Sequence, residues 1–107
     1  MYNTKLTPEQ KFLLKKYKGE MTENMAFAHV PEEGLTVLVK VYPDHIKVTT
    51  SLASRRERKF RKKVGELLTL NRMNLHEYLV MPNKYLRQGL HPEAIADLVA
   101  TDLAYQC

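Results

Sequence analysis

The sequence predicts an α+β protein, a short antiparallel β-meander or hairpin packed by helices, in the order α-β-β-β-α followed by two or three C-terminal helices. Residues 35–52 carry the strand signal, because apolar and polar side chains alternate in two valine-rich segments separated by a turn. The regions before and after them instead repeat apolar residues at helical spacing. At 107 residues, the chain is expected to fold as a single domain, residues 1–107.

The first helix is expected to begin after Thr7. Thr7 and Gln10 have the spacing of a capping box, and Pro8 is favoured in a first helical turn. Gly19 is expected to end the helix. The apolar stripe expected to pack on the rest of the domain contains Phe12, Leu13 and Tyr17.

Residues 35–42 and 46–52 are predicted to form a β-hairpin, the structural centre of the domain. The turn between them contains Pro43, which fixes φ, and Asp44, whose side chain can bond its own backbone. Residues 25–30 are expected to add a third strand. The side chains expected to face mostly inward are those of Val37, Val39, Val41, Ile46 and Val48, with Leu52 on the face of the last two.

The C-terminal half is predicted to be helical. Ser54 opens a second capping box, so a helix is expected over residues 54–70. Residues 74–81 and 83–90 are predicted to add further helical turns, and residues 91–106 a last helix. The apolar stripes of the two longer helices are expected to contain Phe60, Val64, Leu67 and Leu68 in one, and Ile95, Leu98, Val99 and Leu103 in the other.

The positive charge of the chain is concentrated in one short segment. The net charge is +5, from 17 Lys and Arg residues and 12 Asp and Glu residues. Residues 55–63 hold seven of these cations and one acid, a net +6, which leaves ten cations and eleven acids elsewhere, a net −1. A chain polarised in this way presents one basic pole to its partners.

This basic segment, residues 55–63, is predicted to bind the phosphates of a nucleic acid. Each Lys or Arg that neutralises a phosphate releases counterions, and the planar guanidinium of Arg binds a phosphate bidentately. On a helix such cations repel one another, and those in the first turn oppose the macrodipole. A solvated helix face is the structural alternative. The residues expected to contact nucleic acid are Arg55, Arg56, Arg58, Lys59, Arg61, Lys62 and Lys63.

Lys15 and Lys16 would extend this basic surface if the first helix lies beside the second. Lysines near a helix C-terminus are also favoured by the helix dipole alone. A purely structural role for the two therefore stays open.

The expected order of a helix, three strands and a helix, with cations opening the second helix, resembles the double-stranded-RNA-binding domain. In that family a loop between the first two strands carries a histidine, and a lysine cluster begins the last helix. The stretch FAHVPEEGLTVLVKV resembles the loop and second strand, and SRRERK resembles the cluster. The resemblance covers residues 7–70, and it implies RNA contact by His29 and phosphate contact by Arg55, Arg56 and Lys59. The run RRERK is also similar to the arginine-rich helical peptides with which phage antiterminators bind RNA hairpins.

The sequence contains no pattern typical of catalysis or of metal binding. Its four histidines lack the spacing of a metal site, and its four glycines form no phosphate-binding loop. We therefore expect that the protein is not an enzyme and needs no metal or cofactor. One enzyme class stays open, the small basic ribonucleases that use Lys, Arg and Tyr in place of His.

The expected function is that of a small, non-enzymatic nucleic-acid-binding accessory or regulatory protein, with RNA favoured over DNA and no small-molecule substrate. The alternative is a protein-binding inhibitor or adaptor, similar in size to viral modulators of host machinery, which docks its basic helix on an acidic protein surface. The N-terminus lacks the apolar segment of a signal peptide, no apolar run could span a bilayer, and the only cysteine is Cys107. We therefore expect a cytoplasmic protein without membrane contact.

Overall fold

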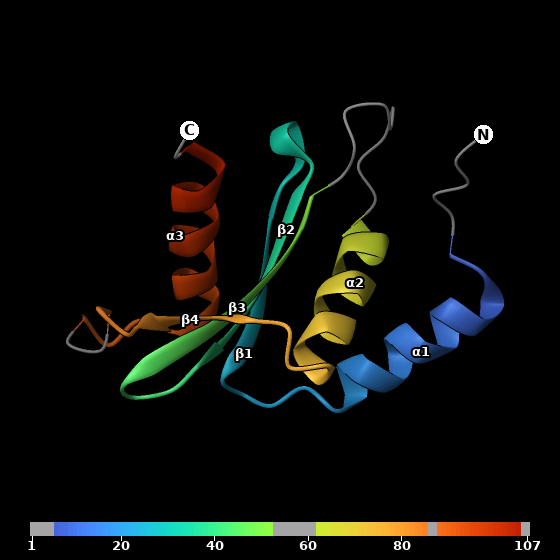
Figure 1. The fold of residues 1–107 in the computed structure, drawn as a ribbon, viewed down its shortest axis with the longest axis horizontal. Coiled ribbons are helices and arrows are strands. Elements are labelled where there is room, and N and C mark those ends of the chain that lie inside the picture. The colour runs from blue at the N-terminus through green and yellow to red at the C-terminus, as the bar shows by residue number, and fades with distance from the viewer. Residues whose placement is uncertain (1–5, 53–61, 86–87, 106–107) are drawn as a thin grey trace.

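The structure, a computed structural model, describes residues 6–52, 62–85 and 88–105. Within them it confirms the α+β class, because an antiparallel sheet of four strands, ordered β1-β2-β3-β4, is covered by three α-helices (Figure 1). The elements in chain order are α1 (Pro8–Gly19), β1 (Met25–Val30), the 3-10 turn η1 (Pro31–Glu33), β2 (Leu35–Val41), β3 (His45–Leu52), α2 (Lys62–Asn74), β4 (Leu79–Pro82) and α3 (Pro92–Tyr105).

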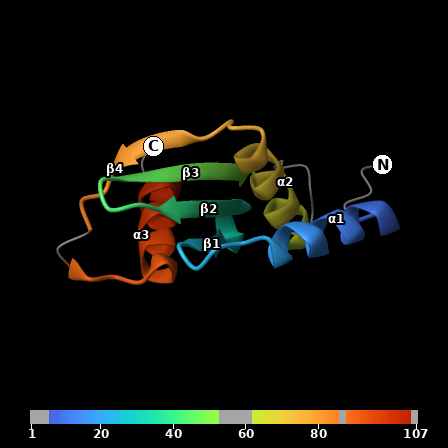
Figure 2. The same cartoon turned by 90° about the horizontal axis from the view of Figure 1, so that it is seen from below.

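The helices cover both faces of the sheet. On one face α3 packs on β1 and β2, and on the other α2 packs on β2 and β3, with α1 beside α2 (Figure 1). Figure 2 shows the strands side by side in their order, with α1 and α2 toward one end of the view. The sheet therefore separates two hydrophobic cores.

Strand β2 contributes to both cores, since consecutive side chains on a strand point to opposite faces. Val37 and Val39 are fully buried in the core beneath α3, whereas Leu38 is fully buried in the core beneath α2. Val39 lies opposite Ala26 of β1 and Val48 of β3. The predicted hairpin and third strand are confirmed, together with the direction of their valines.

The second hairpin strand agrees with the prediction only in part. Ile46 is buried as expected, and Val41 packs at the edge of the same core. Leu52, which was expected on the buried face, is 71% exposed at the end of β3. Leu52 is the last residue of β3, and the residues that follow it lie outside those that the structure describes.

The capping box of α1 is confirmed. The Oγ1 atom of Thr7 accepts a hydrogen bond from the backbone of Gln10, whose side chain accepts one from the backbone of Thr7. The predicted stripe is wrong, because Leu14 is the buried residue while Phe12 is 70% exposed. Since α1 contacts the domain mainly along α2, only a narrow line of its side chains is covered. Of the predicted stripe, Leu13 is exposed and Tyr17 is partly buried.

The stripes of the later helices also differ from prediction. In α2, Leu67 is buried as expected but Leu68 is exposed, and in α3 the same holds for Ile95 and Leu98. Small residues take the places of the exposed leucines, because they let the helix backbones approach the sheet closely. In α2 these are Gly65 and Thr69, and in α3 they are Ala96 and Ala100. The predicted start of α2 at Ser54, and Phe60 with it, lie outside the described residues.

The helix predicted over residues 74–81 is wrong. The last turn of α2 ends in a Schellman motif, in which the backbone N–H of His76 donates to the carbonyl of Met73 and that of Glu77 to the carbonyl of Arg72. His76 adopts the left-handed conformation at φ 60°, which turns the chain back along the sheet.

Strand β4 lies where the helix was expected. It pairs with the otherwise free edge of β3, with Val80 opposite Lys47. Of residues 83–90, residues 84, 85 and 89 form turns, and Gln88 stands in a 3-10 turn in which its backbone N–H donates to the carbonyl of Tyr85. Residues 86–87 of this predicted segment lie outside the described residues. A segment of four residues has little intrinsic preference, so the available edge of β3 decides its conformation.

Candidate functional site

Of the residues predicted to bind nucleic acid, some lie within the part of the chain that the structure describes and others lie outside it. Five of them lie outside the described residues, namely Arg55, Arg56, Arg58, Lys59 and Arg61. Lys62 and Lys63 are the first residues of α2, and both are exposed. Lys15 and Lys16 are exposed on α1, which lies beside α2 as the extended basic surface requires.

The helix that carries Lys62 and Lys63 approaches the sheet very closely. A Cβ atom built on Gly65 would lie 2.2 Å from Oγ1 of Thr36, so only glycine fits between α2 and β2. One turn later, the hydroxyl of Thr69 donates to the carbonyl of Gly65, and the hydroxyl of Thr49 donates to the carbonyl of Thr69. The first two turns of α2 are therefore held rigidly on β2 and β3.

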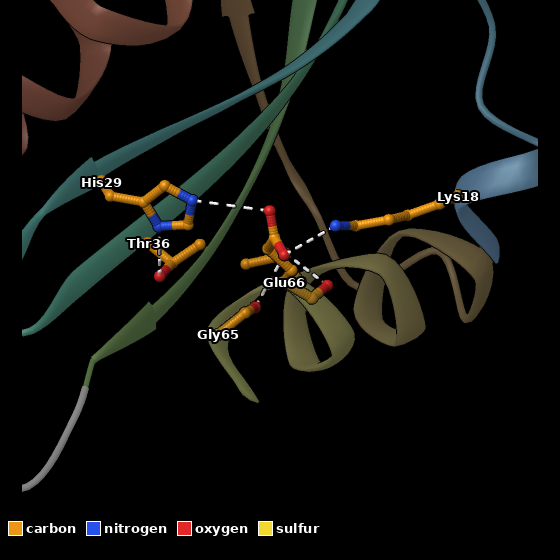
Figure 3. Close-up of polar contacts among 6 residues, drawn as sticks. Lys18, His29, Thr36, Gly65 and Glu66 are labelled. Atoms are coloured by element: carbon orange, nitrogen blue, oxygen red, sulfur yellow. Dashed lines mark hydrogen bonds and ion pairs between the residues drawn. The ribbon is translucent and has the colours of Figure 1, made fainter. Parts of the chain in front are cut away.

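A polar network around Glu66 also holds the beginning of the described part of α2 in place (Figure 3). The carboxylate of Glu66 forms an ion pair with Nζ of Lys18 at 2.9 Å and lies 3.6 Å from Nε2 of His29. The other ring nitrogen of His29, Nδ1, lies 3.1 Å from Oγ1 of Thr36. Glu66 thus joins α1, α2 and β1 with a side chain that is only 12% exposed.

His29 is held in its neutral form by this environment. Burial lowers the pKa of His29 below its usual 6.5, and the nearby charge of Lys62 acts in the same direction. Glu66 acts against them, because its carboxylate favours a protonated ring. The distance of 3.6 Å between His29 and Glu66 shows that α2 lies close to the end of β1 at this point.

The position of His29 differs from the expectation. The resemblance implied a histidine in the loop between the first two strands, whereas His29 lies within β1 and its side chain is 16% exposed. Its ring contacts Thr36 and Glu66 inside the molecule. The network itself was not foreseen, since the residues that form it are scattered over four elements.

A second group of cations was missed from the sequence. Lys40 of β2 and Lys47 of β3 lie directly opposite each other in the register, on the face of the sheet that α2 covers in part. Neither forms an ion pair with any carboxylate among the residues that the structure describes. The hairpin register and the turn at Pro43 could have revealed this pairing, because they place the two lysines at equal distances from the turn.

Two tyrosine rings hold the second group in place. Nζ of Lys47 lies 4.6 Å from the ring centre of Tyr78 and 5.1 Å from that of Tyr42. Nζ of Lys40 lies 5.8 Å from the ring centre of Tyr42, which also stacks on His45. Hydrogen bonding to Tyr78 raises the pKa of Lys47 above its usual value, so this ammonium stays charged.

Both lysines line a pocket of about 370 Å³ between the end of α1, the sheet and the segment that leads from α2 to β4. Its apolar wall comes from Met21, Met25, Leu70 and Met73, and its aromatic wall from Tyr17 and Tyr78. Glu20 is the only carboxylate among the described residues that line it.

No family model, no curated protein and no solved structure matches this chain. The resemblance to the double-stranded-RNA-binding domain therefore stays a prediction. In the described ranges, no three His, Cys, Asp or Glu side chains are grouped so that they could hold a metal ion. No helix in the same ranges is both long and apolar enough to cross a membrane.

Proposed function

We propose that this protein is a non-enzymatic nucleic-acid-binding protein, with RNA favoured over DNA, that holds phosphates through the basic segment. The observation that supports the proposal is the charge distribution. A net +6 is confined to residues 55–63 of a chain whose remainder is −1. Nucleic acids present phosphates at regular short intervals, and a segment dense in cations is suited to neutralise several of them.

The described end of the basic segment supports the proposal further. Lys62 and Lys63 stand in the first described turn of α2, without any acidic residue in that turn. Both side chains are exposed and therefore accessible to a phosphate from solvent.

The frame beneath these lysines suits a binding surface. Gly65 and Thr69 hold α2 closely on the sheet, and Glu66 ties it to α1 and β1. A rigid frame lowers the ordering cost of binding, because only the long side chains must be fixed.

Titrations of labelled duplex RNA, single-stranded RNA and duplex DNA over a range of salt concentrations test the proposal. If about four cations meet phosphates, log K should fall against log salt with a slope of roughly −3 to −4. Lys62→Gln and Lys63→Gln should each reduce that slope by about one. Lys84→Gln is the matched control, because Lys84 is exposed beside Asp102 of α3 on the other side of the sheet.

Two results would contradict the proposal. One is the absence of binding to any of the three nucleic acids below tens of micromolar at low salt. The other is a salt slope that Lys84→Gln changes as much as Lys62→Gln does. Binding to a purified acidic protein, lost in the Lys62 and Lys63 variants, would instead support the protein-docking alternative.

A further inference from the structure

The pair formed by Lys40 and Lys47 is unfavourable in the free protein. Like charges directly opposite each other on neighbouring strands destabilise a sheet. Opposite charges at two such register partners would attract each other. Both positions are nevertheless lysine, and no described carboxylate forms an ion pair with either. An anion bound between the two ammonium groups would remove the repulsion.

The tyrosines position this charge without neutralising it. The rings of Tyr42 and Tyr78 flank Nζ of Lys47 at 5.1 and 4.6 Å, distances at which a cation is attracted to an aromatic face. A carboxylate in their place would orient the lysine equally well, but it would cancel the positive charge. The arrangement therefore leaves the ammonium both oriented and available to an anion.

The rest of the pocket indicates what the anion is attached to. A volume of about 370 Å³ lies within the range of small-molecule sites. Away from the lysines, the walls are thioether and aromatic side chains, among them Met21, Met73 and Tyr17. Methionine adapts its shape to flat rings and makes favourable contacts with them. Glu20 at the pocket supplies acceptors for hydroxyl or amino groups.

We infer that this pocket binds a nucleoside monophosphate group, with the phosphate between Lys40 and Lys47 and the base against the methionine and tyrosine wall. The group could be a free nucleotide or the phosphorylated end of a strand, since both offer the same chemistry. The site contains no residue of the basic segment, so the inference does not rest on the proposed function.

Calorimetric titration with AMP, adenosine and inorganic phosphate tests the site. We expect AMP to bind at least tenfold more tightly than either fragment, because it alone engages both parts of the pocket. Lys40→Gln and Lys47→Gln should each weaken AMP binding about tenfold or more. Lys84→Gln and the double variant Lys62→Gln, Lys63→Gln should leave it unchanged, which separates this site from the basic segment.

Thermal melting distinguishes a ligand site from a structural role. The C-terminal residues of α1 and α2 border the pocket, and cations are favoured at helix C-termini. If the lysines served only to stabilise the partial negative charge at those helix C-termini, Lys40→Gln would lower Tm. If they form an anion site, Lys40→Gln should keep or raise Tm without ligand, and AMP should raise Tm in the parent but not in this variant.

A short oligoribonucleotide with and without a 5′ phosphate identifies the source of the group. Tighter binding of the phosphorylated strand than of AMP would indicate a strand end, and tighter binding of AMP a free nucleotide. The inference is overturned if AMP binds no better than inorganic phosphate. It is also overturned if Lys40→Gln and Lys47→Gln bind AMP as the parent does, or if Lys40→Gln lowers Tm.

Discussion

At the scale of single residues, Gly65 sets how closely α2 approaches the sheet. Its position requires the absence of a side chain, because Oγ1, Cβ and Cγ2 of Thr36 all lie within 3.3 Å of where a Cβ atom would stand. Thr36 cannot easily yield, since it is fully buried and its hydroxyl contacts His29.

Gly65→Ala should therefore destabilise the protein. Overpacking typically costs about 1–3 kcal/mol, and a Cβ atom 2.2 Å from Oγ1 of Thr36 places this site at the upper end of that range. The gain of about 1 kcal/mol in helix propensity therefore offsets only part of the cost. Gly19→Ala at the end of α1 is the matched control, because nothing lies within 4 Å of its added Cβ. Urea unfolding of both variants measures the difference. A Gly65→Ala variant as stable as Gly19→Ala would contradict the close contact between α2 and β2.

The environment of His29 makes a prediction about pH. Its pKa is lowered in the folded protein, mainly by burial, so the unfolded chain binds a proton more readily than the folded one. The stability contributed by a neutral His29 is complete above the unfolded pKa of about 6.5 and falls as pH drops toward the lowered folded pKa.

The urea midpoint of the parent should accordingly decrease between pH 7.5 and 5. His29→Gln should show a shallower decrease, whereas His91→Gln, at an exposed position, should behave as the parent does. If the urea midpoint falls equally with pH in the parent and in His29→Gln, the pKa of His29 is not lowered by folding.

At the scale of secondary-structure elements, the end of α2 determines the conformation of the next segment of the chain. His76 occupies the position of the Schellman motif that is usually glycine, at φ 60°. A side chain in this conformation costs about 1 kcal/mol, and the motif directs the chain into β4 instead of a further helix.

His76→Gly should thus stabilise the protein by about 0.5–1 kcal/mol, which raises Tm by a few degrees for a domain of this size. His76→Ala is the control, because it also loses the imidazole but keeps a Cβ atom in the strained conformation. Differential scanning calorimetry should rank the glycine variant above the alanine variant. The opposite order would show that the contact of His76 with the ring of Tyr78 outweighs the strain.

At the scale of the whole molecule, β2 couples the two hydrophobic cores. Leu38 and Val39 are neighbours in the chain and both are fully buried, but they point into cores on opposite faces of the sheet. Loss of packing on either face should therefore be felt by the entire domain.

Leu38→Ala should cost about 2–5 kcal/mol and Val39→Ala somewhat less, in proportion to the volume removed. Each variant should still unfold in one cooperative transition, with the same midpoint by far-ultraviolet circular dichroism and by tyrosine fluorescence. Two separate transitions in either variant would show that the cores are independent units.

The sequence by itself determined the features whose signals lie within a few neighbouring residues. The capping box at Thr7, the alternation over residues 35–52 and the turn at Pro43 were each sufficient to predict α1, β2 and β3. The concentration of charge in residues 55–63 is likewise a property of the sequence alone.

Only the tertiary structure decided which residues meet across the fold. It selected Leu14 over Phe12 for burial, placed glycine at the contact of α2 with β2, and turned Leu79–Pro82 into a strand by offering the edge of β3. It also brought Lys40 and Lys47 together at a pocket whose walls come from separate parts of the chain. These outcomes depend on the surface that another element presents, which no local pattern encodes.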